Sequence, residues 1–497
     1  MESEKLGATS HLRLLEAAAG LVVLAFFLNA MTKTEADPDL WGYLAFGRLF
    51  WQTGVFPYRD VFSYVPTLPL WVYHEWLTGV VFYPLYLKFG GTGLQLLRYA
   101  LALATLGLLY LTARERGADG LSAALVLFVI QVFAVIGFSP VRAQTFTYLG
   151  YAATLYALEK ARITQQRRVL WLLVPLQLLW SNLHGGFLAG LGLMALYALG
   201  EALSRRPFLP YLRVLLLAGL ATLINPYGLK YWLYLFHAVS MPRPDITEWA
   251  SILTAYQKNY LGTFEVTYLL FLMALTGFLA VRARWREPAP MLALGLALYL
   301  GLRHQRHLVF PLMLMGAYLP VLLKSYLESH SQLLAALSRL DWRIPATLLC
   351  FLALVSGYQF SQHGPLRLEI PPLPQRNIRP GKYYPMGALE FIRAHHLQGN
   401  LLTEFGWGEY LIWSLYPQCR VALDGRYETV YPGEVANKYF DFVNQSGRAR
   451  QFLEDYPPDL ILLAPNTGAC PVLRADPRWR QVYADPGSIL FIPKDRK

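Results

Sequence analysis

Long apolar runs separated by short polar connections dominate the first 361 residues of the chain. A straight helix needs ~20 apolar residues to cross the hydrocarbon core of a bilayer, and these runs reach or nearly reach that length. The runs cover residues 12–31, 94–113, 120–138, 144–160, 168–181, 184–203, 209–224, 265–282, 289–302, 307–323 and 344–361. The pattern predicts a polytopic α-helical membrane protein with about 11 spans.

The charges in the connections predict the orientation of these spans. Lys and Arg gather in alternate connections, which should face the cytoplasm by the positive-inside rule. The basic connections hold Arg114 and Arg116; Lys160, Arg162, Arg167 and Arg168; Arg205, Arg206 and Arg213; Arg282, Arg284 and Arg286; and Lys324, Arg339 and Arg343. The N-terminus is then cytoplasmic, on an uncleaved anchor, and the C-terminal region is extracytoplasmic.

The aromatic segment 71–89 is ambiguous, because it is long but contains His74, Glu75 and Pro84. Counting it as a span would break the alternation of basic connections. We therefore interpret it as a juxtamembrane or re-entrant helix on the outer side. Residues 31–93 then form one large outer loop that carries amphipathic helices such as Leu40–Trp51.

The composition changes at about residue 362, which predicts three parts. Residues 1–361 form the membrane domain, residues 362–382 a Pro-rich linker, and residues 383–497 an extracytoplasmic α/β domain. In the last part we expect a helix at Pro385–His396 and strands at Asn400–Thr403, Arg420–Leu423, Asp459–Leu463 and Ser488–Ile492.

Charge and cysteine content refine this interpretation. The chain is 55% hydrophobic and only 15% charged, against about 25% charged residues in soluble proteins. The net charge of +12 is explained by the basic cytoplasmic connections, and no basic stretch joins a nucleic-acid-binding module. Cys350 lies in an apolar run and is expected in the core. Cys419 and Cys470 would be able to form a disulfide in an extracytoplasmic domain.

Acidic and aromatic residues gather where the first apolar run ends. Glu35, Asp37 and Asp39 are followed by Trp41 and Tyr43. His74 and Glu75 lie in the same outer loop, at the start of a helix that is otherwise apolar. Ionisable groups are costly at the membrane, so these residues are candidates for function.

Further polar residues lie at the outer ends of other spans. They are Arg142, Asn182, His184, Glu248, Arg303, His304, Arg306 and His307. Four basic or titratable residues lie between positions 303 and 307, on the side where the positive-inside rule disfavours Lys and Arg. Arginine offers a bidentate fork to phosphate oxygens, so this group predicts a phosphate site.

These residues together suggest sugar transfer from a polyprenyl-phosphate donor. A carboxylate base takes the acceptor proton, a role that suits Asp37 or Asp39. Arg303, His304, Arg306 and Arg142 would stabilise the leaving phosphate. The aromatic helix would hold the lipid. The remaining candidates, expected to contact substrate, are Trp41, Tyr43, His74, Glu75, His184, Asn182 and Glu248.

Eight motifs carry a resemblance to a bacterial family of multi-span proteins usually classed with the C-superfamily glycosyltransferases. They are DPDLWGYLAFGRLF, GVFPYRDVFSY, WVYHEWL, PVRAQTF, SNLHGGF, INPYG and the C-terminal pair GWGEYLIW and ALDGRYETVY. Protein O-mannosyltransferases and lipid A aminoarabinose transferases belong to this superfamily. The resemblance covers nearly the whole chain and implies a membrane enzyme that transfers a hexose or pentose to a glycan, lipid or protein of the cell envelope.

The resemblance also implies roles for particular residues. An acid of the first outer loop acts as base or metal ligand in the superfamily, and Asp37 and Asp39 occupy that position. A divalent metal, Mg²⁺ or Mn²⁺, is therefore a candidate cofactor. Many relatives have Trp-Trp-His after the second acid, where this chain has Trp41, Gly42 and Tyr43, so a His ligand is missing. In the outer domain, Asp424 and Arg426 follow a predicted strand, where α/β folds often place ligand groups.

Two other functions remain open at this point. A non-enzymatic carrier or flippase for lipid-linked glycans would place polar residues at mid-membrane depth, whereas here they gather at the outer ends. A scaffold that recruits envelope partners through residues 383–497 would not depend on the acids of the first outer loop.

Overall fold

The computed structural model describes residues 2–32, 35–138, 140–240, 247–330, 341–362, 364, 366, 368, 384–447, 449 and 451–495. The chain divides into two compact units. The helical unit comprises residues 1–34, 95–229 and 239–367, and the α/β unit comprises residues 35–94, 230–238 and 368–497. The predicted linker 362–382 lies almost entirely outside the described residues.

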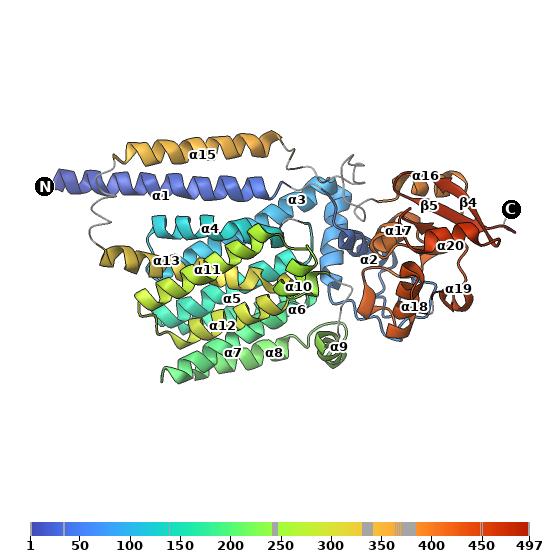
Figure 1. The fold of residues 1–497 in the computed structure, drawn as a ribbon. Helices are drawn as coiled ribbons and strands as arrows, with labels where there is room; N and C mark the ends of the chain where they lie inside the picture. The colour runs from blue at the N-terminus through green and yellow to red at the C-terminus, as the bar shows by residue number, and fades with distance from the viewer. Residues whose placement is uncertain are drawn as a thin grey trace. The chain divides into compact units, whose positions relative to one another are not determined.

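Helices build the helical unit (Figure 1). They are α1 (Glu2–Ala30), α4 (Gly120–Phe138), α5 (Gln144–Thr164), α6 (Leu173–Leu183), α7 (Phe187–Leu203), α8 (Leu209–Ala221), α10 (Ile252–Gln257), α11 (Thr263–Arg282), α12 (Pro288–Arg303), α13 (Val309–Ser329) and α15 (Arg343–Gln362). Short 3₁₀ segments lie at Arg167–Leu172, Thr247–Trp249 and Gln305–His307. Each predicted apolar run falls on a helix of this unit or on α3 (Trp76–Glu115), which continues into it.

Five helical segments among the described residues are long and apolar enough to cross a membrane. They are Arg13–Ala30, Trp76–Glu115, Thr263–Arg282, Gln305–Ser329 and Arg343–Gln362. Several other helices are apolar but shorter, so the count of about 11 spans stays a prediction. The core of the unit is formed around α13, which packs on α4, α11 and α12. α1 lies alongside α15 (Figure 1), and Cys350 on α15 is exposed, which corrects the expected core position.

The α/β unit contains the first outer loop as well as the C-terminal region. Its helices are α2 (Pro38–Thr53), α16 (Met386–Ala394), α17 (Gly408–Leu415), α18 (Gly433–Asn444), α19 (Gln451–Asp455) and α20 (Ala469–Ala475). It also holds part of α9 (Leu229–Ser240) and the start of α3, which breaks at Gly90 with φ of 62°. Residues 35–94 and the C-terminal region, which are far apart in the sequence, thus belong to one compact unit.

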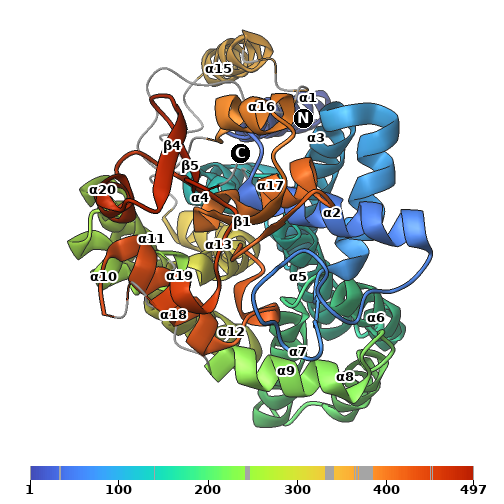
Figure 2. The ribbon, with the colours of Figure 1, turned by 90° about the vertical axis from the view of Figure 1, so that its right-hand side faces the viewer.

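A five-stranded sheet forms the centre of this unit. Its strands are β1 (Gly399–Thr403), β2 (Cys419–Val421), β3 (Leu460–Leu463), β4 (Trp479–Ala484) and β5 (Ile489–Pro493), in the order β2-β1-β3-β5-β4. β1 is parallel to β2 and to β3, whereas β5 is antiparallel to both of its neighbours. α16 lies on one side of the sheet, and α18 and α19 lie on the other (Figures 1 and 2). The four predicted strands and the predicted helix are confirmed, while β4 was not expected.

The first outer loop joins this sheet at its β2 edge. Ser63 forms a parallel bridge with Val421, where Val421 N donates to Phe62 O at 3.0 Å and Tyr64 N donates to Val421 O at 3.1 Å. Both backbone polar groups of Val421 are thereby hydrogen-bonded. This part of the sheet edge is therefore covered by the loop.

Helix α2 is defined by strong local signals. Asp37 is its N-cap and accepts a hydrogen bond from Asp39 N at 3.1 Å, and Pro38 occupies the first helical position. Gly54 ends the helix in the left-handed conformation with φ of 66°. These are favoured capping residues at both ends. α2 packs on α17, with Trp41 edge-on to Tyr410 at a ring distance of 5.1 Å.

The two cysteines of the α/β unit are not bridged. The structure holds Cys419 and Cys470 as separate buried thiols, so the disulfide that the sequence left possible is not formed. Cys470 Sγ donates instead to Ala464 O at 3.2 Å. Burial raises the pKa of the Cys470 thiol to about 11, which keeps it protonated and unreactive at neutral pH.

Candidate active site

The carboxyl ends of the parallel strands β1, β2 and β3 lie at one edge of the sheet. The chain leaves β1 toward β2 and then crosses back over β1 to reach β3, so the two connections run in opposite directions. Ligand sites of α/β sheets occur at the carboxyl ends of the strands. Glu409 follows β1 at the start of α17, and Asp424 and Arg426 follow β2.

An acidic cavity of about 70 Å³ opens at this edge. Its lining residues are Asp39, Tyr43, Tyr73, His74, Glu75, Glu409, Gly425, Arg426, Glu428 and Thr429. The first outer loop contributes half of them and the C-terminal region the other half. One cavity of the α/β unit is therefore lined by candidates that lie more than 300 residues apart in the sequence, such as Asp39 and Arg426.

The structure separates the two acids proposed as the base. Asp37 caps α2, while Asp39, in the first turn of the same helix, lines the acidic cavity. A carboxylate in the first turn also interacts favourably with the helix dipole. Of the two acids, Asp39 thus lines the cavity, whereas Asp37 caps the helix that carries Asp39.

Glu409 is an acidic residue that the sequence analysis did not select. It is 6% exposed, and its Oε2 accepts a hydrogen bond from Gly42 N at 3.0 Å. A side chain at position 42 would collide with this carboxyl group. Gly42 thus makes room for Glu409 at the place where many members of the resembled family have tryptophan. The motif GWGEYLIW carried the signal, since it places an acid in the first turn of a helix after a strand.

Glu409 and Asp39 form a pair of neighbouring carboxyl groups at the cavity. A Cβ atom added at Gly425 would lie 2.8 Å from Glu409 Oε1 and 3.6 Å from Asp39 Oδ1, so both groups border the same space. Burial, reinforced by the charges of Asp39 and Asp424, raises the pKa of Glu409 well above its ordinary value. The raised pKa favours the protonated form of Glu409. Environments that shift the pKa of one acid of a neighbouring pair are common in enzyme sites.

Replacing Glu409 by Gln tests this charge state. An unfolded chain releases the Glu409 proton above its ordinary pKa, whereas the folded chain retains it. The wild-type protein therefore loses up to about 1.4 kcal/mol of stability per pH unit as pH rises through this window. We expect Glu409→Gln, an isostere of the neutral acid, to raise the melting temperature at pH 8 and to change it little at pH 4. Thermal unfolding of the full chain in detergent at both pH values measures this. An equal shift at both, or a loss at pH 8, would contradict a protonated Glu409.

Arg426 is the buried centre of an ion network below the cavity. Its guanidinium pairs with Asp60 and with Asp424, whose Oδ2 lies 2.6 Å from Nη2. The rings of Phe62 and Trp71 lie 5.1 Å and 5.0 Å from the guanidinium carbon. Because Asp60 belongs to the first outer loop, this network fixes that loop to the strand ends.

The other candidates of the first outer loop surround the cavity in different ways. His74 Nε2 lies 3.8 Å from Glu75 Oε1, and the His74 ring stacks on Tyr234 of α9 at 6.0 Å. Tyr43 lines the cavity, while Trp41 is 1% exposed and packs between Tyr384 and Tyr410. Trp41 therefore supports the site rather than facing it.

A second set of candidates gathers in the helical unit around Trp249. We call Arg142, Glu248, His304 and Arg306 the cationic cluster. Arg142 Nη1 lies 2.8 Å from Glu248 Oε1, the Arg306 guanidinium lies 4.7 Å from the Trp249 ring centroid, and His304 Nδ1 lies 2.8 Å from Trp249 O. Burial would raise the pKa of Glu248, but the charges of Arg142 and Arg306 outweigh it and lower that pKa.

The last candidates of the helical unit divide between exposed and structural positions. Arg303 is exposed in the last turn of α12 and has no ion pair among the described residues. Asn182 donates to Leu178 O at 2.8 Å and to Ile224 O at 3.0 Å. His184 Nδ1 lies 2.7 Å from Thr147 Oγ1 and accepts from Gly186 N. Asn182 and His184 thus bind the backbone and side chains that connect their helices.

The acids of the cavity do not form a ready metal site. In the part of the chain that the structure describes, no three His, Cys, Asp or Glu side chains converge closely enough to hold a metal ion. Oxygen-rich cavities suit Mg²⁺ or Mn²⁺, but a divalent ion needs more convergent ligands than the Asp39 and Glu409 pair supplies here. We therefore derive no chemical step through a metal.

Comparison with solved structures identifies the fold. The archaeal oligosaccharyltransferase AglB from Archaeoglobus fulgidus, in complex with an inhibitory peptide and a dolichol-phosphate, matches with a TM-score of 0.57 and 13% identity, over 91% of this chain and 69% of that one. ArnT from Cupriavidus metallidurans in the apo state matches with a TM-score of 0.55 and 14% identity, over 98% of both chains. The chain shares the fold of these two transferases. ArnT bound to undecaprenyl phosphate also matches, with a TM-score of 0.51 and 13% identity, over 96% of this chain and 97% of that one.

The similarity to C-superfamily structures is one of fold and not of close sequence. No protein-family model matches the chain, and no curated protein matches it in sequence. The C-superfamily fold agrees with the resemblance that the sequence motifs carried, and it includes both the helical unit and the small C-terminal sheet.

Proposed function

We propose that the protein is a membrane glycosyltransferase that moves a sugar from a polyprenyl-phosphate donor to a hydroxyl group of a cell-envelope acceptor. The observation that carries the proposal is the acidic cavity at the carboxyl ends of β1 and β2, where Asp39 lies beside Glu409, whose pKa is raised by burial. The dolichol-phosphate and undecaprenyl phosphate bound to AglB and ArnT support a lipid-phosphate donor. The plasma membrane and its outer face are the proposed location.

The transfer has two changes of bonding that the protein must assist. The acceptor oxygen forms a bond to the anomeric carbon of the sugar, and its proton passes to the Asp39 carboxylate, which acts as general base. The bond between that carbon and the phosphate oxygen breaks, and the polyprenyl phosphate leaves with the electron pair. Glu409 borders the same space as Asp39, and its carboxyl group is held by the hydrogen bond from Gly42 N.

We assign stabilisation of the leaving phosphate to the cationic cluster. Arg142 and Arg306 offer charge-assisted hydrogen bonds to phosphate oxygens, and the exposed Arg303 keeps its proposed role beside them. Glu248 neutralises part of this charge by pairing with Arg142 at 2.8 Å. A phosphate that binds Arg142 must therefore compete with Glu248.

Binding of synthetic undecaprenyl phosphate to the purified protein tests this assignment, with native mass spectrometry as the readout. We expect Arg142→Gln and Arg306→Gln each to weaken binding by about tenfold, as loss of one charge-assisted hydrogen bond implies. Glu248→Gln should strengthen binding, because it removes the competing carboxylate. A structural defect would not produce this opposite sign.

The matched control is Arg286→Gln, since Arg286 is an exposed arginine on the connection between α11 and α12 and belongs to no cluster. It should bind undecaprenyl phosphate as the wild type does. Equal binding by all variants would contradict a donor site at the cationic cluster.

A further inference from the structure

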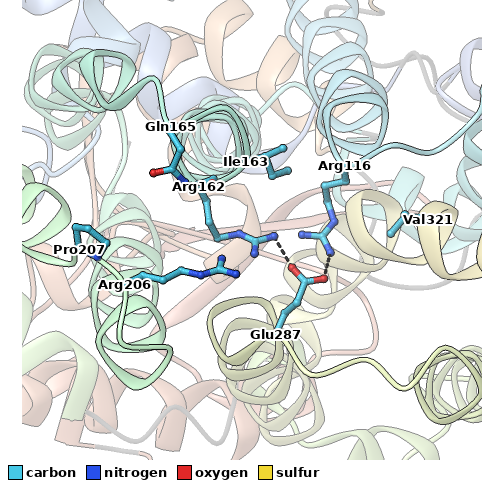
Figure 3. Close-up of a pocket in the computed structure, with 8 residues that line it drawn as sticks. All are labelled: Arg116, Arg162, Ile163, Gln165, Arg206, Pro207, Glu287 and Val321. Carbon is cyan, nitrogen blue, oxygen red and sulfur yellow. Dashed lines mark hydrogen bonds and ion pairs between the residues drawn. The ribbon is translucent and has the colours of Figure 1, made fainter.

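A second cavity, of about 540 Å³, lies in the helical unit, where α3 and α5 end and α12 begins (Figure 3). It is lined by Arg116, Arg162, Ile163, Gln165, Arg206, Pro207, Glu287 and Val321. Its arginines belong to the basic connections that the sequence predicts on the cytoplasmic side. None of these residues has a part in the proposed transfer reaction.

Two of the arginines are held in place by two glutamates. Arg116 lies 2.7 Å from Glu159 and 2.9 Å from Glu287. Arg162 lies 2.8 Å from Glu159 and 2.5 Å from Glu287. The side chains of Arg116 and Glu159 are almost fully buried. These four groups balance one another in charge, and Arg116, Arg162 and Glu287 line the cavity.

Arg206 is a third arginine of the lining, and it does not belong to this group of two arginines and two glutamates. Arg206 points toward Arg162 and Glu287 in Figure 3, with no interaction drawn to it, and it has no ion pair among the described residues. Arg116 Nε likewise has no hydrogen-bond partner there. Glu201, on α7, is 4% exposed, interacts electrostatically with Arg162 and Arg206 and does not line the cavity. The lining itself therefore holds three arginines and one glutamate, which suits an anion.

The surroundings indicate which anion fits. Ile163, Pro207 and Val321 give the cavity an apolar wall, and it lies at the ends of apolar helices. Basic pockets between membrane helices on the cytoplasmic side are suited to the head groups of anionic lipids. We propose that this cavity binds the phosphate group of an anionic phospholipid, with Arg206 as the residue that selects for negative charge.

Lipid binding by the full chain in detergent tests the proposal. Phosphatidylglycerol, phosphatidylcholine and inorganic phosphate are titrated separately and followed by native mass spectrometry. We expect the wild type to bind phosphatidylglycerol more tightly than phosphatidylcholine, and Arg206→Gln to weaken binding of phosphatidylglycerol by about tenfold. Because Arg206 is exposed and makes no ion pair, this variant should fold normally, which its melting temperature checks.

Arg205→Gln is the control, since it removes the same charge from the neighbouring residue, which is exposed but does not line the cavity. It should leave the preference for phosphatidylglycerol unchanged. Equal losses in both variants, or equal binding of the two lipids by the wild type, would overturn the proposal. Binding of inorganic phosphate without phosphatidylglycerol would overturn the lipid as the source of the phosphate group.

Discussion

Asp39→Asn is expected to lower the rate of sugar transfer in membranes by about 10²- to 10⁴-fold, because it removes the proposed general base. Asn has nearly the same shape as Asp but cannot accept the acceptor proton. The measurement is transfer of labelled sugar from the polyprenyl-phosphate pool of membranes that contain equal amounts of each variant.

Asp37→Asn is the matched control for this result. Asn is as good an N-cap as Asp, so α2 should keep its start and the transfer rate should change little. Glu75→Gln provides a second comparison, since Glu75 lines the same cavity. Unchanged transfer in Asp39→Asn, or a greater loss in Glu75→Gln, would show that Asp39 is not the base.

Arg426→Met is expected to give the largest loss of stability. It leaves the buried carboxylates of Asp60 and Asp424 without their common positive partner. Removing one member of a buried ion network costs about 3–5 kcal/mol, a large part of the total stability of a typical domain. Thermal unfolding in detergent should show a much lower melting temperature, or separate melting of the α/β unit.

Two variants check the cause of this loss. Arg420→Met makes the same replacement on an exposed residue of β2 and should be nearly neutral. Adding Asp60→Asn to Arg426→Met removes one of the two buried carboxylate charges that have lost their arginine partner, and this should recover part of the stability. A melting temperature for Arg426→Met equal to that of Arg420→Met would contradict the role of the network.

The sequence predicted those elements whose signals are local. Helix α2 begins with Asp37 and Pro38 and ends at Gly54, and the buried strands β1, β3 and β5 are short apolar runs between polar segments. β4 (Trp479–Ala484) has no such signal, because residues such as Arg480 and Gln481 on this edge strand are exposed. Hydrophobic periodicity does not mark a strand that buries neither face.

The composition of the acidic cavity depended on contacts that sequence patterns do not contain. Asp39 and Glu75 were selected because acids are rare beside apolar helices. Glu409 was missed, because an acid in the first turn of a helix is ordinary until Gly42 and Asp39 are known to face it. A disulfide between Cys419 and Cys470 was considered possible from the expected compartment alone, which does not determine whether two thiols lie close enough to bond.

The mass of the lipid that co-purifies with Asp39→Asn tests the central claim most directly. A transferase that lacks its base should still bind its donor but should not consume it. We therefore expect the Asp39→Asn protein to retain polyprenyl phosphate that still carries its sugar, and the wild type to retain mainly the bare polyprenyl phosphate. Ordinary phospholipids alone in both proteins, even after addition of synthetic polyprenyl phosphate, would contradict a polyprenyl-phosphate-dependent glycosyltransferase.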